Sequence, residues 1–182
     1  DPAADPAVNY GAIGGVIGHE ITHGFDDQGR KSDGEGVLRD WWTAEDAAKF
    51  EARAKLLAAQ YSAIEVLPGA KVNGELTLGE NIADQGGLLL ALDAYRLSRG
   101  GRPAPLLDGL TGEQRLFYAW AQVWRSVTRE ETTRKLLVVD THTPTAVRAR
   151  APVRNVDAWY QAFDVKPGDA DYLPPEQRVR IW

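Results

Sequence analysis

The sequence predicts a mainly α-helical fold with few or no strands. Along one stretch, apolar residues repeat at steps of four and three, which gives a helix a single apolar face. These residues are Phe50, Ala54, Leu57, Tyr61 and Ile64. A second stretch, residues 78–95, is rich in leucine and too long for a typical strand. Thr111 and Gln114 match a capping box, which marks the start of a helix.

The first helix is expected over residues 10–25, after residues 1–8, which are predicted to be a linker. Its glycines are Gly11, Gly14, Gly15 and Gly18. Each costs roughly 0.8–1.0 kcal/mol against alanine in a helix interior. Gly11 and Gly15 are four residues apart, as are Gly14 and Gly18, so each pair leaves a flat stripe. We expect another element to pack closely on these stripes and offset the cost.

This helix carries an H-E-x-x-H match that contains two of the three histidines of the chain. In a helix, His19 and His23 lie on one face, one turn apart. Both imidazoles can then reach one zinc ion at about 2.0–2.1 Å. Glu20 lies at the edge of the same face, where it can reach a water molecule bound to that ion. The pattern is typical of a zinc peptidase.

The same motif also occurs by chance, with two ordinary histidines and a solvated glutamate. The flanking residues Val16, Ile17 and Ile21 favour the metal site. They make the helix apolar around the motif, so we expect it to be buried, and buried ionisable groups need partners.

Carboxylates further along the chain can complete the site. Asp26 can accept the second N–H of His23 and fix its tautomer, or it can be a solvated turn residue. Glu80 and Asp84 are four apart on a predicted helix, where like charges repel unless a cation or donors lie between them. Glu80 is then the third zinc ligand, and Asp84 accepts a histidine N–H. In the alternative, Thr77 and Glu80 form a capping box.

The third histidine, His142, precedes a helix with Thr143 as its expected N-cap and Pro144 in its first turn. Arg148 lies six residues after His142. From the residues alone, a structural histidine and a solvated arginine are the simpler interpretation. Further helices are expected at 43–64, 111–127, 130–139 and 156–163, with a strand at 136–139 as the alternative. Asn155 is expected to cap the last of these helices. The chain is expected to stop the helix of 43–64 at 67–69, to form a loop or short strand at 69–74, and to end in an irregular tail at 167–182.

Composition excludes several classes of function. The 182 residues fit one domain or a piece of a larger protein. A net charge of −5 gives no basic surface for nucleic acid. The absence of cysteine excludes disulfides, thiolate zinc sites and a cysteine nucleophile. The longest apolar runs are too short to span a membrane.

Taken together, the motifs resemble the carboxy-terminal catalytic part of the neprilysin and endothelin-converting-enzyme family of zinc metallopeptidases, which are gluzincins. The matching segments are residues 9–30, 40–42, 78–87, 121–124, 142–144 with Arg148, and 180–182. The resemblance covers nearly the whole chain and implies a thermolysin-like core around an active-site helix. It also implies that residues 1–182 belong to a larger two-domain peptidase. An upstream domain, absent from this sequence together with the family's Asn-Ala-aromatic motif, would cover the site.

The resemblance implies a zinc-dependent endopeptidase that cleaves small peptides. His19, His23 and Glu80 would bind one Zn²⁺ per chain, and Glu20 would be the general base. Family members are mostly extracytoplasmic, so that location is expected. The alternative is a zinc-binding or interaction module that is inactive without its upstream domain.

The resemblance also assigns roles around the metal. Asp26 and Asp84 would orient the ligand histidines, with Asp84 counted among the catalytic residues. His142 would donate to the oxyanion of the tetrahedral intermediate. Arg148 would bind a carbonyl or carboxylate group of the substrate.

Overall fold

The computed structural model describes all 182 residues and is mainly helical, as predicted. The α-helices are α1 (Pro6–Asn9), α2 (Gly15–Thr22), α3 (Ala44–Ser62), α4 (Leu78–Arg99), α5 (Gly112–Val123), α6 (Glu130–Val139), α7 (Thr145–Arg150) and α8 (Asp157–Phe163). The strands β1 (Glu65–Leu67) and β2 (Ala70–Lys71) form one antiparallel hairpin, with Glu65 opposite Lys71. None of the helices combines the length and the apolar character that crossing a membrane requires.

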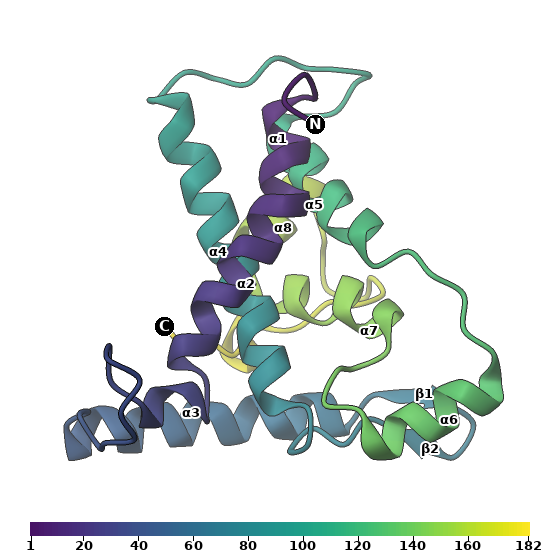
Figure 1. Cartoon of the computed structure of the whole chain (residues 1–182). Helices are drawn as coiled ribbons and strands as arrows, with labels where there is room; N and C mark the ends of the chain where they lie inside the picture. The colour runs from purple at the N-terminus through teal and green to yellow at the C-terminus, as the bar shows by residue number, and fades with distance from the viewer.

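The helices are arranged around α4. In Figure 1, α1, a π-helical turn (Tyr10–Gly14) and α2 form one continuous rod beside α4, while α3 lies across the base. One hydrophobic cluster joins α3 to the start of α4, α7 and the tail around Val179 and Ile181. A second cluster joins the later part of α4 to α5 and to residues 153–158. Helix α2 packs directly along α4, with Gly18 against Gly87, which brings the H-E-x-x-H motif next to Glu80 and Asp84.

Glycines allow the rod to approach its neighbours closely. A Cβ atom on Gly15 would lie 2.9 Å from the ring of Trp120 in α5, and one on Gly18 would lie 2.8 Å from the carbonyl oxygen of Gly87 in α4. These contacts confirm close packing at both positions. Gly14 differs, because a Cβ atom there would meet only Asn9 and Tyr10 of its own segment, at 3.5 Å or more.

The expected linker 1–8 is partly helical. Asp5 caps α1 through its side chain, and Pro6 occupies the first turn, where a missing N–H is tolerated. Ala7 is fully buried, and Asp5 pairs with the buried Arg115 of α5 at 2.5 Å. The segment therefore packs against the helical body.

Two predicted helices end earlier than expected. The helix beginning at residue 44 stops at Ser62, and the chain turns at Gly69 (φ +71°) to form the β hairpin. The helix predicted to reach residue 127 stops at Val123, and Val127 is fully exposed. Residues 136–139 are helical, so the strand alternative is wrong.

Two predicted caps are also wrong. Pro144 occupies the N-cap position of α7, while Thr143 is buried and does not cap the helix. Val156 occupies the N-cap position of α8. The Asn155 side chain instead accepts the N–H of Val179 at 2.9 Å and exchanges hydrogen bonds with Gln60. These hydrogen bonds tie the tail to α3.

Candidate metal centre

Helix α2 places two imidazoles together. His19 is buried in its last turn, and His23, its C-cap residue, is one turn further along. Their Nε2 atoms lie 3.0 Å apart. Two nitrogen ligands of a tetrahedral zinc ion lie roughly 3.3 Å apart, given zinc–nitrogen bonds of about 2.0–2.1 Å. Both nitrogens therefore face a point where one metal ion could bind.

A carboxylate lies against the other nitrogen of each ring. His23 Nδ1 lies 2.7 Å from Asp26 Oδ2, and Asp26 Oδ1 accepts the backbone N–H groups of Gln28 and Gly29 at 2.8 and 2.7 Å. His19 Nδ1 lies 2.9 Å from Asp84 Oδ1, although the ring N–H is not aligned for a straight hydrogen bond. An acceptor beside Nδ1 favours a proton there, which leaves the Nε2 lone pair for a metal.

Glu80, in the first turn of α4, is the third candidate metal ligand, through a carboxylate oxygen. Its Oε2 atom lies 3.2 Å from His19 Nε2 and 3.7 Å from His23 Nε2. Thr77 makes no capping hydrogen bond, and its hydroxyl donates to the carbonyl of Asn73 instead. The capping-box alternative is therefore wrong, and Glu80 is free to face the histidines.

These residues fit a zinc ion. The candidate ligand atoms of His19, His23 and Glu80 all lie within 4.8 Å of one another. Glu80 Oε2 is buried and has no hydrogen-bond partner, although it is surrounded by imidazole nitrogens. Such an atom needs a cation or a donor. Two neutral imidazoles and a carboxylate form a known catalytic zinc set.

The charges of Asp84 and Glu80 change the pKa of His19, and the histidines change the pKa of Glu80. Burial lowers the pKa of His19, but Asp84 and Glu80 outweigh burial and raise this pKa to about 9. Burial alone would raise the pKa of Glu80, but the neighbouring histidines lower it overall. His19 must lose this proton before Nε2 can bind a metal, so metal binding is coupled to proton release.

Arg148 lies directly behind Asp84. Its Nε donates to Asp84 Oδ2 at 2.8 Å and its Nη2 to Asp84 Oδ1 at 2.6 Å. The guanidinium also stacks on the ring of Trp124, with its carbon 3.8 Å from the ring centroid. Arg148 thus orients Asp84, and Nη1 is the nitrogen not used in this pair.

His142 lies across the site on the loop before α7. Its Nε2 is 3.2 Å from Glu80 Oε2, and its Nδ1 is 2.9 Å from Asp140 Oδ1. The same carboxylate oxygen accepts the His142 backbone N–H at 2.9 Å. Both contacts lower the pKa of Asp140, the backbone N–H more strongly. Sequence reasoning missed Asp140, although a carboxylate two residues before a candidate histidine was a usable signal.

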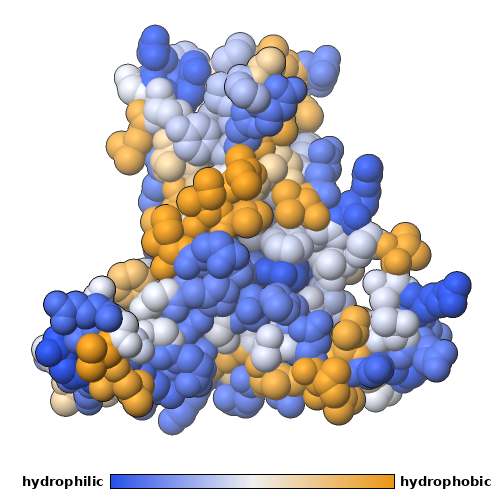
Figure 2. Space-filling model, viewed as in Figure 1, coloured by the Kyte–Doolittle hydropathy of each residue, from blue (hydrophilic) through white to orange (hydrophobic).

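Glu20 lies on the exposed side of α2 and makes no hydrogen bond or ion pair. The expected burial of the motif holds for His19 but not for the flanking Ile17 and Ile21, which are exposed. Ile13, Ile17, Ile21 and Phe25 are 44–57% exposed and form a stripe along the rod, which we call the isoleucine stripe. It coincides with the orange band across the centre of Figure 2. The Glu20 side chain is therefore open to solvent on this side.

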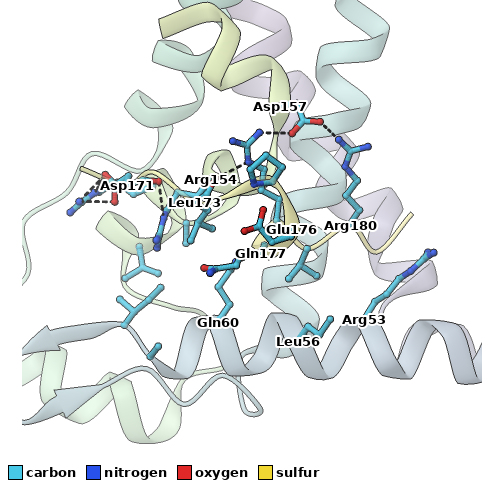
Figure 3. Close-up of a pocket in the computed structure, with 18 of the residues that line it drawn as sticks. Arg53, Leu56, Gln60, Arg154, Asp157, Asp171, Leu173, Glu176, Gln177 and Arg180 are labelled. Carbon is cyan, nitrogen blue, oxygen red and sulfur yellow. Dashed lines mark hydrogen bonds and ion pairs between the residues drawn. The ribbon is translucent and has the colours of Figure 1, made fainter. Parts of the chain in front are cut away.

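A large cavity lies elsewhere in the molecule. It measures about 1220 Å³ and lies between α3 and the tail, with no candidate metal ligand in its wall. Figure 3 shows Arg53, Leu56 and Gln60 on α3 below, facing the Asp157 and Arg180 pair above. Asp157 also accepts from Arg178, and Arg150 pairs with Asp171. These charges compensate one another, whereas Arg53, Glu65, Arg154 and Glu176 in the same wall form no ion pair.

Peptidase family M13 matches residues 1–179. The chain belongs to this family. It is 41% identical to neprilysin-1 of Caenorhabditis elegans over 97% of its length and 40% identical to a neutral endopeptidase of Lactococcus lactis over 96%. It spans only 24% and 26% of those two relatives. The family resemblance predicted from the motifs is confirmed.

The fold agrees with M13 structures. The zinc metalloprotease Zmp1 of Mycobacterium tuberculosis, solved with an inhibitor, superposes with a TM-score of 0.98 at 56% identity. The match covers all of this chain and 29% of Zmp1. The predicted helical metallopeptidase core is confirmed at the level of the fold.

Proposed function

We propose that this chain carries the catalytic centre of a zinc-dependent endopeptidase. The observation that carries the proposal is the convergence of His19, His23 and Glu80 on one point, with the exposed Glu20 next to His19 in the chain. His19, His23 and Glu80 would hold one zinc ion. Membership of a peptidase family supports peptides as the substrate class.

When bound, zinc acts as a Lewis acid that makes a water molecule nucleophilic at neutral pH and polarises a carbonyl group. Glu20 would take the proton of the attacking water as general base. It would then deliver that proton to the nitrogen of the departing amine, so that the peptide C–N bond breaks and an acid and an amine form. Its lack of internal partners supports this role, because the carboxylate remains available to the reactants.

His142 would donate a proton or hydrogen bond to the oxyanion that develops on the substrate carbonyl. Asp140 would keep His142 oriented from the other side of the ring, as their 2.9 Å contact supports. Asp26 and Asp84 would orient His23 and His19. Arg148, through Nη1, would bind a carbonyl or carboxylate group of the substrate while its other donors hold Asp84.

We infer that the isoleucine stripe is covered in the working enzyme by the remainder of a longer polypeptide. The stripe runs along the catalytic helix, and large contiguous apolar patches mark interaction sites. The chain spans about a quarter of the relatives it matches, so those proteins have additional chain to place there.

An upstream domain would enclose the site and limit substrates to small peptides. An extracytoplasmic location rests on the family resemblance.

Substitution Glu20→Gln tests the function. It preserves size and should leave the metal content at one zinc ion per chain, while peptide hydrolysis falls at least about a hundredfold, the lower range for general-base catalysis. The exposed Glu75, substituted as Glu75→Gln, is the control and should change neither measurement. Hydrolysis of a fluorogenic peptide and elemental analysis should be run with and without the upstream segment. Equal hydrolysis by wild type and Glu20→Gln would contradict this role of Glu20.

A further inference from the structure

Five aromatic side chains gather where the segment after the motif meets the tail. Trp182, which is half-exposed, packs against three of the others, with ring centroids 6.3 Å from Phe25, 6.1 Å from Trp42 and 5.6 Å from Phe50. Trp41 completes the group, 6.5 Å from Phe25 and 5.9 Å from Trp42. We call these residues the aromatic cluster. Most of its pairs meet edge to face, the arrangement that aromatic rings prefer.

The tail holds Trp182 in place from the core outward. Ile181 is buried in the cluster of α3 and α4, and its carbonyl oxygen accepts from Arg53 Nη1 at 3.0 Å. Two residues earlier, the carbonyl of Val179 accepts from Gln85 at 2.5 Å. Gln85 is the residue after Asp84 on α4. The position of Trp182 is therefore tied to the helix that carries two carboxylates of the metal centre.

Phe25 links this cluster to the metal centre. It lies in the 3₁₀ turn His23–Phe25, between the candidate ligand His23 and its carboxylate partner Asp26. On the inner side, Asp26 is held by the backbone N–H groups of the following turn. On the outer side, the Phe25 ring, which is 44% exposed, meets only Trp41 and Trp182 among aromatic residues. These rings limit the directions in which the turn can move.

We propose that Trp182 is a positioning residue of the metal centre. It holds the Phe25 ring and so fixes the turn that sets the His23–Asp26 geometry. The inference rests on the proposed zinc site. Residues that orient a metal ligand affect metal affinity about 10- to 100-fold, and Trp182 acts one contact further away. An edge-to-face contact corresponds to roughly a two- to tenfold change in an equilibrium constant.

The test uses the full-length polypeptide that contains this chain. Trp182→Leu retains an apolar side chain and removes the ring, while Trp182→Phe restores a ring. Phe163→Leu is the control, because Phe163 packs against Phe117, Tyr118 and Trp159, away from the metal centre. Zinc affinity is measured by chelator competition, and the visible absorption spectrum of the Co²⁺-substituted protein reports ligand geometry.

We expect Trp182→Leu to weaken zinc binding roughly three- to tenfold, within the range of an edge-to-face contact, and to alter the Co²⁺ spectrum. Trp182→Phe should restore both, and Phe163→Leu should change neither. Phe25→Leu should weaken binding similarly, and adding Trp182→Leu to it should cause little further loss. Unchanged affinity and spectrum in Trp182→Leu, an equal effect of Phe163→Leu, or additive losses in the double variant would overturn the inference.

The outcomes separate this inference from the proposed site. Wild-type protein that binds no zinc would overturn the metal centre, and the role of Trp182 with it. Zinc binding in wild type that is insensitive to Trp182 would overturn the positioning role alone. If Trp182→Leu does not fold, Phe25→Leu still decides, because unchanged zinc affinity in that variant contradicts a path through the Phe25 ring.

Discussion

Arg148 binds Asp84 through two parallel hydrogen bonds of 2.8 and 2.6 Å, while Asp84 Oδ1 also lies 2.9 Å from His19 Nδ1. The guanidinium therefore orients the carboxylate that faces a candidate metal ligand. The chain of contacts joins α7, α4 and α2, with Arg148 and Asp84 both buried. It links the stability of the fold to the geometry of the site.

Replacement Arg148→Met should destabilise the protein by about 3–5 kcal/mol, because it leaves Asp84 as a buried carboxylate without its cation. Arg150→Met is the matched control on the same helix. Arg150 pairs with Asp171 at 2.8 Å, but its side chain is 66% exposed, so a loss below about 1 kcal/mol is expected. Urea unfolding of both variants measures the difference. Equal losses would contradict a structural role for the buried pair.

Substitution Glu80→Ala should lower zinc content, because it removes the only carboxylate among the three candidate ligands. The exposed Glu75 lies nearby in the chain, and Glu75→Ala should retain one zinc ion per chain. Elemental analysis after dialysis against a weak chelator measures the outcome. Full zinc occupancy in Glu80→Ala would remove Glu80 from the ligand set.

Asp140→Ala should reduce kcat about tenfold and leave zinc content unchanged, because it removes the support of His142 but no candidate ligand. His142→Ala should have the larger effect, about 10²- to 10³-fold, as expected for loss of a donor to the oxyanion. Asp164→Ala, on a side chain that is 81% exposed, is the control. Steady-state kinetics on one peptide would refute the pairing if Asp140→Ala behaved like Asp164→Ala.

Gly18→Ala should destabilise the fold by about 1–3 kcal/mol, the usual cost of overpacking. Its Cβ atom would lie 2.8 Å from the Gly87 carbonyl oxygen, and backbone cannot move aside as a flexible side chain can. Gly14→Ala is the control, with its nearest contact at 3.5 Å, and should be neutral or stabilising by up to about 1 kcal/mol from helix propensity. Thermal unfolding distinguishes them, and the reverse order would refute the packing argument.

Local signals in the sequence were enough to predict most of the helices and part of the candidate metal site. The spacing of His19 and His23 places them on one helix face whatever surrounds that helix. Thr111 caps α5 as predicted, and Thr43 caps α3 in the same way, since a cap depends on residues three positions away. Helix ends were less predictable. Val127 continued the apolar pattern but is exposed, because periodicity does not specify which neighbours are present to bury a residue.

The sequence by itself determined a helical metallopeptidase core, the pair of histidines and the family. Only the tertiary structure decided that Glu80 faces the histidines instead of capping its own helix, and that Arg148 holds Asp84. It also placed Asp140 beside His142, left the isoleucine stripe exposed and brought Trp182 against Phe25. Spacing and caps depend on near neighbours in the chain. Contacts between distant segments depend on how the helices pack, which the glycines of α2 and the two hydrophobic clusters determine together.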